Sequence, residues 1–156
     1  ITRLHSVIDS AKLPEDDSWL SAEMDEAFNF DTPAEIMRAL RTSGSPWAIE
    51  TLKTLEKRSP LMLHVSLRQI RLGRHMSLAD ELRLERTLVQ HCFYTNHLDR
   101  AGAQTETVEG IRALAVDKDH SPVWNPARIE DVTPAMVDPF FESPWAQEDH
   151  PLADLD

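Results

Sequence analysis

Apolar side chains recur every three to four residues along most of this chain, and prolines or glycines separate the stretches that carry the pattern. This spacing is typical of amphipathic α-helices. No stretch of useful length alternates apolar and polar residues as a half-buried β-strand does. The pattern therefore predicts a mainly α chain, with helices over approximately residues 2–11, 20–28, 33–42, 46–57, 60–73, 78–97, 105–116 and 134–137.

Hydroxyl side chains mark the predicted helix starts, and proline follows most of them. A hydroxyl oxygen at this position accepts hydrogen bonds from first-turn amides, and proline in that turn lacks only an amide that would have no helical partner. Gly73 is expected to end the helix over 60–73 as its C′ residue. The start signals are Thr32-Pro33, Ser45-Pro46, Ser59-Pro60, Ser77 and Thr133-Pro134, with Glu35 completing a capping box.

The stretch from Thr105 to Ala127 changes from helical to extended. Its apolar residues have helical spacing up to the charged tripeptide Asp117-Lys118-Asp119. Ser121-Pro122 and Asn125-Pro126 prevent the helix from continuing, because a residue before proline is pushed out of the α region. Trp124 is therefore predicted to lie on a rigid extended arm.

Three segments of the sequence resemble the 3-hydroxyisobutyryl-CoA hydrolases, a branch of the crotonase superfamily. Residues 109–127 resemble the family's Glu-Gly-Val/Ile-Arg-Ala helix, Ile-Asp-Lys-Asp turn and Pro-x-Trp-x-Pro-Ala arm. Residues 59–69 resemble its Ser-Pro-Thr-Ser-Leu-Lys-x-Thr-Leu-Arg-Gln helix start, and residues 84–90 resemble its Met-Glu-Tyr-Arg-Leu-Ser-Gln segment. The chain departs from the family at Leu61-Met62, in place of Thr-Ser, and at Asn125, where a lysine is usual.

The resemblance implies the fold and what the chain lacks. Residues 1–141 are expected to form the C-terminal helical region of a crotonase-like (ClpP/crotonase) fold, and residues 142–156 an acidic, flexible tail. The family keeps its β-sheet core, oxyanion-hole amides and catalytic carboxylates in the N-terminal half, which nothing here resembles. We therefore expect no catalytic residue in this chain. Because it begins with Ile1, we expect a cleaved, split or truncated product.

Charge and composition limit the partners of the chain. The net charge is −11, and fourteen of the sixteen basic residues lie between Arg38 and Arg128, between two acidic ends. Such a chain is expected to bind nucleic acid poorly, although a basic middle face remains possible. No apolar run approaches the ~20 residues of a membrane span, so no membrane partner is expected. The single cysteine, Cys92, excludes an internal disulfide and fits a reducing compartment.

Several pairs of reactive side chains admit a catalytic and a structural interpretation. With four glycines and no Cys/His cluster, the sequence predicts neither a phosphate loop nor a metal site. His91-Cys92 could be a nucleophile pair, but adjacent helical residues do not face each other, which favours a core cysteine. Glu81 and Glu85 could be paired carboxylates, but the arginines beside them favour a solvated face.

His64, Arg68, Arg71 and His75 form one basic stripe along a predicted helix. The stripe could meet a phosphate. The alternative, which we favour, is a solvated face or salt bridges to the chain's own carboxylates.

Lys118 and Trp124 are the candidate binding residues. The resemblance implies that their arm lies near the adenine and phosphates of coenzyme A, and an aromatic face with a cation suits a nucleotide. The alternative is that Trp124 only packs the arm onto the helices. No resident cofactor is expected beyond the coenzyme A part of a substrate.

The resemblance implies hydrolysis of an acyl-CoA thioester in valine breakdown, in the mitochondrial matrix, by a protein that includes this chain. Its partners would be an N-terminal crotonase core and acyl-CoA. The alternative is a non-catalytic component of the small subunit of the mitochondrial ribosome, bound to mitochondrial ribosomal proteins.

Overall fold

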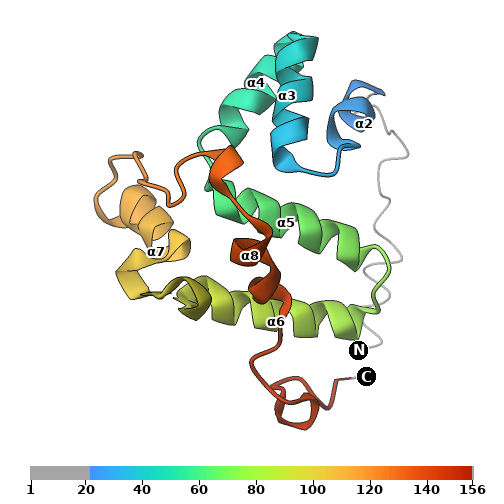
Figure 1. Cartoon of the computed structure of the whole chain (residues 1–156), viewed down its shortest axis with the longest axis vertical. Coiled ribbons are helices and arrows are strands. Elements are labelled where there is room, and N and C mark those ends of the chain that lie inside the picture. The colour runs from blue at the N-terminus through green and yellow to red at the C-terminus, as the bar shows by residue number, and fades with distance from the viewer. Residues whose placement is uncertain (1–21, 156) are drawn as a thin grey trace, which may run out of the picture.

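The computed structural model describes residues 22–155, and within them the fold is mainly helical, as predicted (Figure 1). The helix expected over residues 2–11 lies outside the described residues. The α-helices are α2 (Ala22–Phe28), α3 (Pro33–Ser43), α4 (Pro46–Leu55), α5 (Pro60–Gly73), α6 (Leu78–Phe93), α7 (Glu106–Ile111) and α8 (Pro134–Val137). The strands are β1 (Tyr94–Thr95) and β2 (Arg100–Ala101). Shorter helical turns span Asn96–Leu98, Gly102–Gln104, Arg112–Val116, Ile129–Asp131, Asp138–Phe141 and Gln147–Asp149.

Four of the predicted capping residues are found at the N-terminal ends of their helices. Thr32 accepts a hydrogen bond from the Glu35 amide at 3.3 Å, and the Glu35 carboxylate accepts one from the Thr32 amide at 3.0 Å, which completes the capping box. Ser45, Ser59 and Ser77 cap α4, α5 and α6 by accepting a hydrogen bond from the backbone amide three residues ahead. Thr133 precedes Pro134 at the start of α8, but its side chain makes no capping hydrogen bond.

Two predicted helix ends are wrong. Gly73 is the last residue of α5 rather than its C′ residue, and Arg74 continues in the right-handed region. The left-handed glycine is Gly44, which ends α3 with φ 62°. The longest helix ends at Phe93 and not near His97, because residues 94–95 pair antiparallel with residues 100–101.

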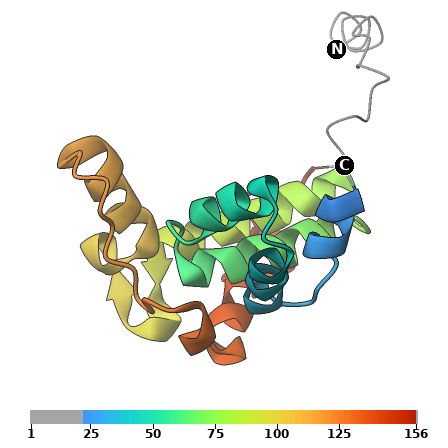
Figure 2. The same cartoon turned by 90° about the horizontal axis from the view of Figure 1, so that it is seen from above.

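The helices pack in two clusters. In Figure 1, α8 and the turn after it lie across the long α5–α6 pair. Their contact forms the larger core, which consists of Leu61, Val65, Leu88, Val137 and Phe140. The hairpin of α3 and α4 packs with α2 around the smaller core of Ala27, Ile36, Leu40 and Ala48. Figure 2 shows α7 at one end of the molecule, with the arm running beside it.

The C-terminal segment contacts α6. The guanidinium of Arg83 donates hydrogen bonds to the carbonyls of Leu152 at 3.0 Å and Ala153 at 3.3 Å. The guanidinium of Arg86 lies 4.9 Å from the ring centre of Trp145. The acidic tail therefore has defined attachment points, and its flexibility stays a prediction.

One side of α6 carries apolar residues without cover. Leu78, Leu82, Val89 and Phe93 lie within roughly 60° of one another around the helix axis at 100° per residue. We call these four residues the α6 stripe, and their exposed fractions range from 37% to 73%. Among the described residues, none of the helices combines the length and apolar character needed to cross a membrane. The four exposed side chains of the α6 stripe form an uncovered apolar surface in this structure.

Candidate functional site

An open groove of about 700 Å³ lies where the start of α5, helix α7 and the arm meet. Its walls are mostly apolar, and cationic side chains also line it. The apolar lining includes Met62, Leu63, Leu114, Pro122 and Trp124, and the basic lining consists of Lys57, Arg58 and His120. A groove with this lining can accept a ligand that has both an aromatic or aliphatic part and an anionic part.

Trp124 lines this groove and also attaches the arm to the helices. Its indole Nε1 donates a hydrogen bond to the Lys57 carbonyl at 3.1 Å. On α7, a Cβ added at Gly110 would lie 3.4 Å from Cη2 of the indole. Glycine thus lets the ring approach the helix closely. Both interpretations of Trp124 are compatible with this geometry.

Lys118 lies on the turn before the arm, and it does not line the groove. Lys118 is exposed, and its backbone is left-handed with φ 56°. The backbone of His120 is also left-handed, with φ 53°. His120, which the sequence did not single out, does line the groove. The structure therefore brings Trp124 and His120 together and leaves Lys118 outside them.

Arg112 holds this turn in place. Its guanidinium donates to Asp117 and Asp119 at 2.7 Å each, and to the Ser121 carbonyl at 3.1 Å. Nε and the same Nη2 that donates to Ser121 also donate to the carboxylate of Glu109, at 2.9 and 2.8 Å. These hydrogen bonds, and one from the Val123 amide, lower the pKa of Glu109 to about 2. The turn is thus fixed by charge-assisted hydrogen bonds, although it contains two strained left-handed residues.

A buried carboxylate, Glu106, lies in the lining of the groove. It accepts a hydrogen bond from the Ser59 hydroxyl and one from the Asn125 amide at 2.9 Å. Arg100 lies 4.0 Å away. Burial raises the pKa of Glu106, and the two hydrogen bonds and the Arg100 charge oppose that rise. Sequence reasoning missed this residue, because a glutamate in the first turn of a helix is usually explained by its favourable interaction with the helix dipole.

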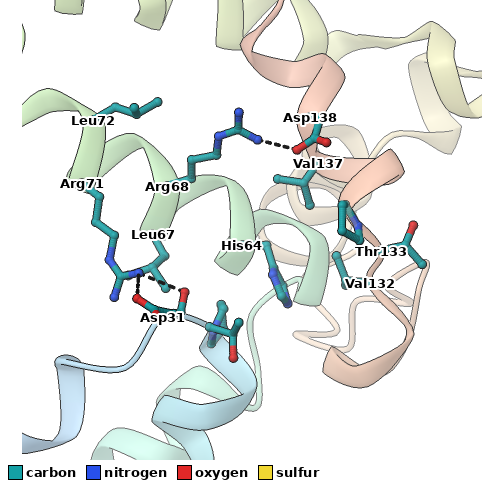
Figure 3. Close-up of a pocket in the computed structure, with 13 residues that line it drawn as sticks. Asp31, His64, Leu67, Arg68, Arg71, Leu72, Val132, Thr133, Val137 and Asp138 are labelled. Carbon is teal, nitrogen blue, oxygen red and sulfur yellow. Dashed lines mark hydrogen bonds and ion pairs between the residues drawn. The ribbon is translucent and has the colours of Figure 1, made fainter.

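The basic stripe on α5 mainly forms salt bridges within the chain (Figure 3). Arg68 binds Asp138 at 2.6 Å, and Arg71 binds Asp31 at 3.3 Å. The favoured alternative of internal salt bridges is therefore confirmed for both arginines. A second pocket, with a volume of about 430 Å³, lies beside this stripe, and His64, Arg68 and Arg71 line it. Burial lowers the pKa of His64, while a hydrogen bond to the backbone of Ile129 opposes the shift.

The remaining reactive side chains have structural contacts. His91 Nε2 lies 2.8 Å from the Glu142 carbonyl oxygen, and Cys92 packs against the larger core. Burial raises the pKa of the Cys92 thiol, which opposes formation of a nucleophilic thiolate. Gln69 donates a hydrogen bond to Glu85 at 3.4 Å. Within residues 22–155, no group of three or more His, Cys, Asp or Glu side chains could hold a metal ion.

Comparisons with known proteins give consistent matches across most of the chain. The model of the enoyl-CoA hydratase/isomerase family matches residues 2–141. The mitochondrial 3-hydroxyisobutyryl-CoA hydrolase of Mus musculus is 33% identical over 144 residues, which cover 90% of this chain and 35% of the relative. Probable 3-hydroxyisobutyryl-CoA hydrolase 2 of Arabidopsis thaliana is 38% identical over 123 residues, which cover 76% of this chain and 31% of the relative.

A solved structure is similar as well. The crystal structure of a carnitinyl-CoA dehydratase from Mycobacterium thermoresistibile matches with a TM-score of 0.67 and 30% sequence identity. The match covers 89% of this chain and 38% of the dehydratase. The chain thus spans about a third of the length of the relatives that it matches.

Proposed function

The chain belongs to the enoyl-CoA hydratase/isomerase family, and from that premise we propose that it is the C-terminal helical part of a 3-hydroxyisobutyryl-CoA hydrolase-like protein. The resemblance to this hydrolase family within the crotonase superfamily is confirmed. The observation that carries the proposal is the similarity to proteins named as such hydrolases over up to 90% of the chain. The named mitochondrial relatives support a mitochondrial location, and we place the protein in the matrix.

The proposed reaction is hydrolysis of an acyl-CoA thioester in valine catabolism. In this chemistry, backbone amides stabilise the oxyanion, and a carboxylate activates water or attacks the thioester. We assign these groups to a sheet-containing N-terminal core outside this chain, either in the same protein or in a separate one. The uncovered α6 stripe supports this assignment, because an apolar surface of this kind usually marks an interface.

We assign binding of the coenzyme A part of the substrate to the groove and its arm. The indole of Trp124 offers an aromatic face, and Lys57, Arg58 and His120 also line the groove. Lys118 lies outside the lining, so we expect it to act on the phosphates only through its charge. The acyl group would lie toward the N-terminal core.

The isolated chain should not hydrolyse 3-hydroxyisobutyryl-CoA above the background rate. The expected reason is that the acid and base carboxylates belong to the core. The test measures thiol release from the substrate at several chain concentrations, with the assembled protein as the positive control. Turnover that rises with chain concentration and disappears when one residue of this chain is replaced would contradict the proposal.

With the core present, Trp124→Ala should weaken coenzyme A binding by roughly 1 kcal/mol, or about fivefold in Kd, the size of an aromatic contact. Lys118→Ala should weaken binding at low salt, and this effect should shrink as ionic strength rises, because an exposed charge is screened. Calorimetry at two salt concentrations measures both effects. Each variant must melt as the parent does. Unchanged affinity in both variants would mean that the arm is only structural.

A component of the mitochondrial ribosome's small subunit is the alternative function. The uncovered α6 stripe favours it to the same extent, because the stripe could bind a ribosomal protein. The net charge of −11 opposes direct contact with RNA. Co-sedimentation of the native protein with ribosomal subunits would support this role. A native mass equal to that of this chain plus the N-terminal core, with no other protein, would support the hydrolase.

A further inference from the structure

The carboxylate of Glu106 joins two segments that are far apart in the sequence. One oxygen accepts the hydroxyl hydrogen of Ser59, the residue that caps α5. The other oxygen accepts the amide hydrogen of Asn125 on the arm, at 2.9 Å. Because each oxygen accepts from a different segment, this one side chain links the arm directly to the start of α5.

Trp124 makes a second attachment at the same corner of the molecule. Its indole donates to the carbonyl of Lys57, two residues before Ser59, and its backbone immediately precedes Asn125. The arm is therefore fixed on both sides of the groove wall that Trp124 forms. With the Glu106–Asn125 hydrogen bond removed, the indole would keep its hydrogen bond to Lys57 and its contact with Gly110. The arm would keep the hydrogen bonds from the Val123 amide to Glu109 and from Arg100 to the Asn125 carbonyl.

The Glu106 carboxylate is buried without a close cation. Its side chain is only 7% exposed, and the nearest cation lies 4.0 Å away. Burial of a carboxylate costs free energy unless partners compensate for the lost water. The hydrogen bonds that do compensate are those that define the geometry of the arm. This arrangement suits a group that fixes a position more than one that adds stability.

We propose that Glu106 is a positioning residue that holds the Trp124 arm at the separation from α5 that the groove's ligand requires. This inference rests on the proposed coenzyme A site. Glu106 need not touch the ligand, since it acts through the backbone of Asn125 and the indole beside it.

The test follows Trp124 directly by fluorine NMR of protein labelled with 5-fluorotryptophan and assembled with its core. The Trp124 signal is identified by its loss in Trp124→Phe. In Glu106→Ala this signal should move toward that of free fluorotryptophan and become narrower, while the other tryptophan signals stay in place. Glu106→Gln is the matched control, because its amide can accept from Asn125 and donate to Ser59. Its Trp124 signal should stay near that of the parent.

Coenzyme A binding provides the second measurement. Glu106→Ala should raise the Kd about fivefold, as Trp124→Ala does. The double variant should bind no more weakly than Trp124→Ala alone, because Glu106 acts through Trp124. A residue that affects binding independently of Trp124 would give additive losses in the double variant.

The outcomes separate this inference from the proposed function. An unmoved Trp124 signal in folded Glu106→Ala would overturn the positioning role. A moved signal with unchanged coenzyme A binding in both single variants would support the positioning role and overturn the proposed coenzyme A site. If Glu106→Ala does not fold, Ser59→Ala replaces it, since one carboxylate oxygen then loses its donor. A smaller shift of the same signal supports the inference, and no shift overturns it.

Discussion

Replacing Phe140 with alanine should lower the free energy of unfolding of the core between α5, α6 and α8 by about 3 to 5 kcal/mol. This is the range for replacement of a buried phenylalanine by alanine. Phe140 is 1% exposed and packs with Leu61, Val65 and Leu88. The rings of His91 and His97 lie against it, with centroids 6.0 and 5.2 Å from its own. These rings are held by backbone carbonyls, so they cannot readily fill the cavity left by the phenyl group. Amide hydrogen exchange in α5 and α6 measures the loss.

Phe30→Ala is the matched control for this prediction. Phe30 lies between α2 and α3, outside the larger core and the α6 stripe, and is 43% exposed, so the same substitution removes less buried area. Its loss should be less than half of that for Phe140→Ala when both are measured in the isolated chain. Equal losses, or a loss below about 1 kcal/mol for Phe140→Ala, would show that the turn after α8 does not close this core.

The helix starts could be predicted because their chemistry is local. The side chain of Ser59 caps an amide three residues ahead, and Thr32 and Glu35 satisfy each other's amides within one turn. Helix ends depend on contacts with residues beyond the helix itself. α6 ends at Phe93 because the next residues pair with residues 100–101, which no helical period indicates.

The candidate site could be predicted only where its chemistry is carried by neighbouring residues. The prolines beside Trp124 identify an extended arm, and the indole does line a groove. Glu106 could not be found in this way, because its partner Ser59 is 47 residues away. The outward position of Lys118 depends on its left-handed backbone, which Arg112 stabilises from the preceding helical turn.

The isolated chain should self-associate and bind a hydrophobic dye through the α6 stripe, and a double substitution in the stripe should block assembly with the core. Leu82 and Val89 are 37% and 51% exposed here. Full burial from water contributes roughly 1.5 to 3 kcal/mol per side chain, so burial of the fractions still exposed here would contribute roughly 1.5 to 2.5 kcal/mol for the pair. Leu82→Asp combined with Val89→Asp should therefore weaken assembly by on the order of a hundredfold or more, since two carboxylates would also lose water.

Ile49→Asp is the matched control for this double variant, because Ile49 is 45% exposed but lies on α4, outside the stripe. It should keep the parent's affinity for the core and its dye binding, whereas the double variant should lose both. Analytical ultracentrifugation of the chain with and without the core measures assembly and self-association together. Circular dichroism must show the same helix content in all three proteins, since the substitutions are on exposed positions. If the double variant assembled as the parent does, the core would have to bind another face, and the stripe would be free for a different protein partner.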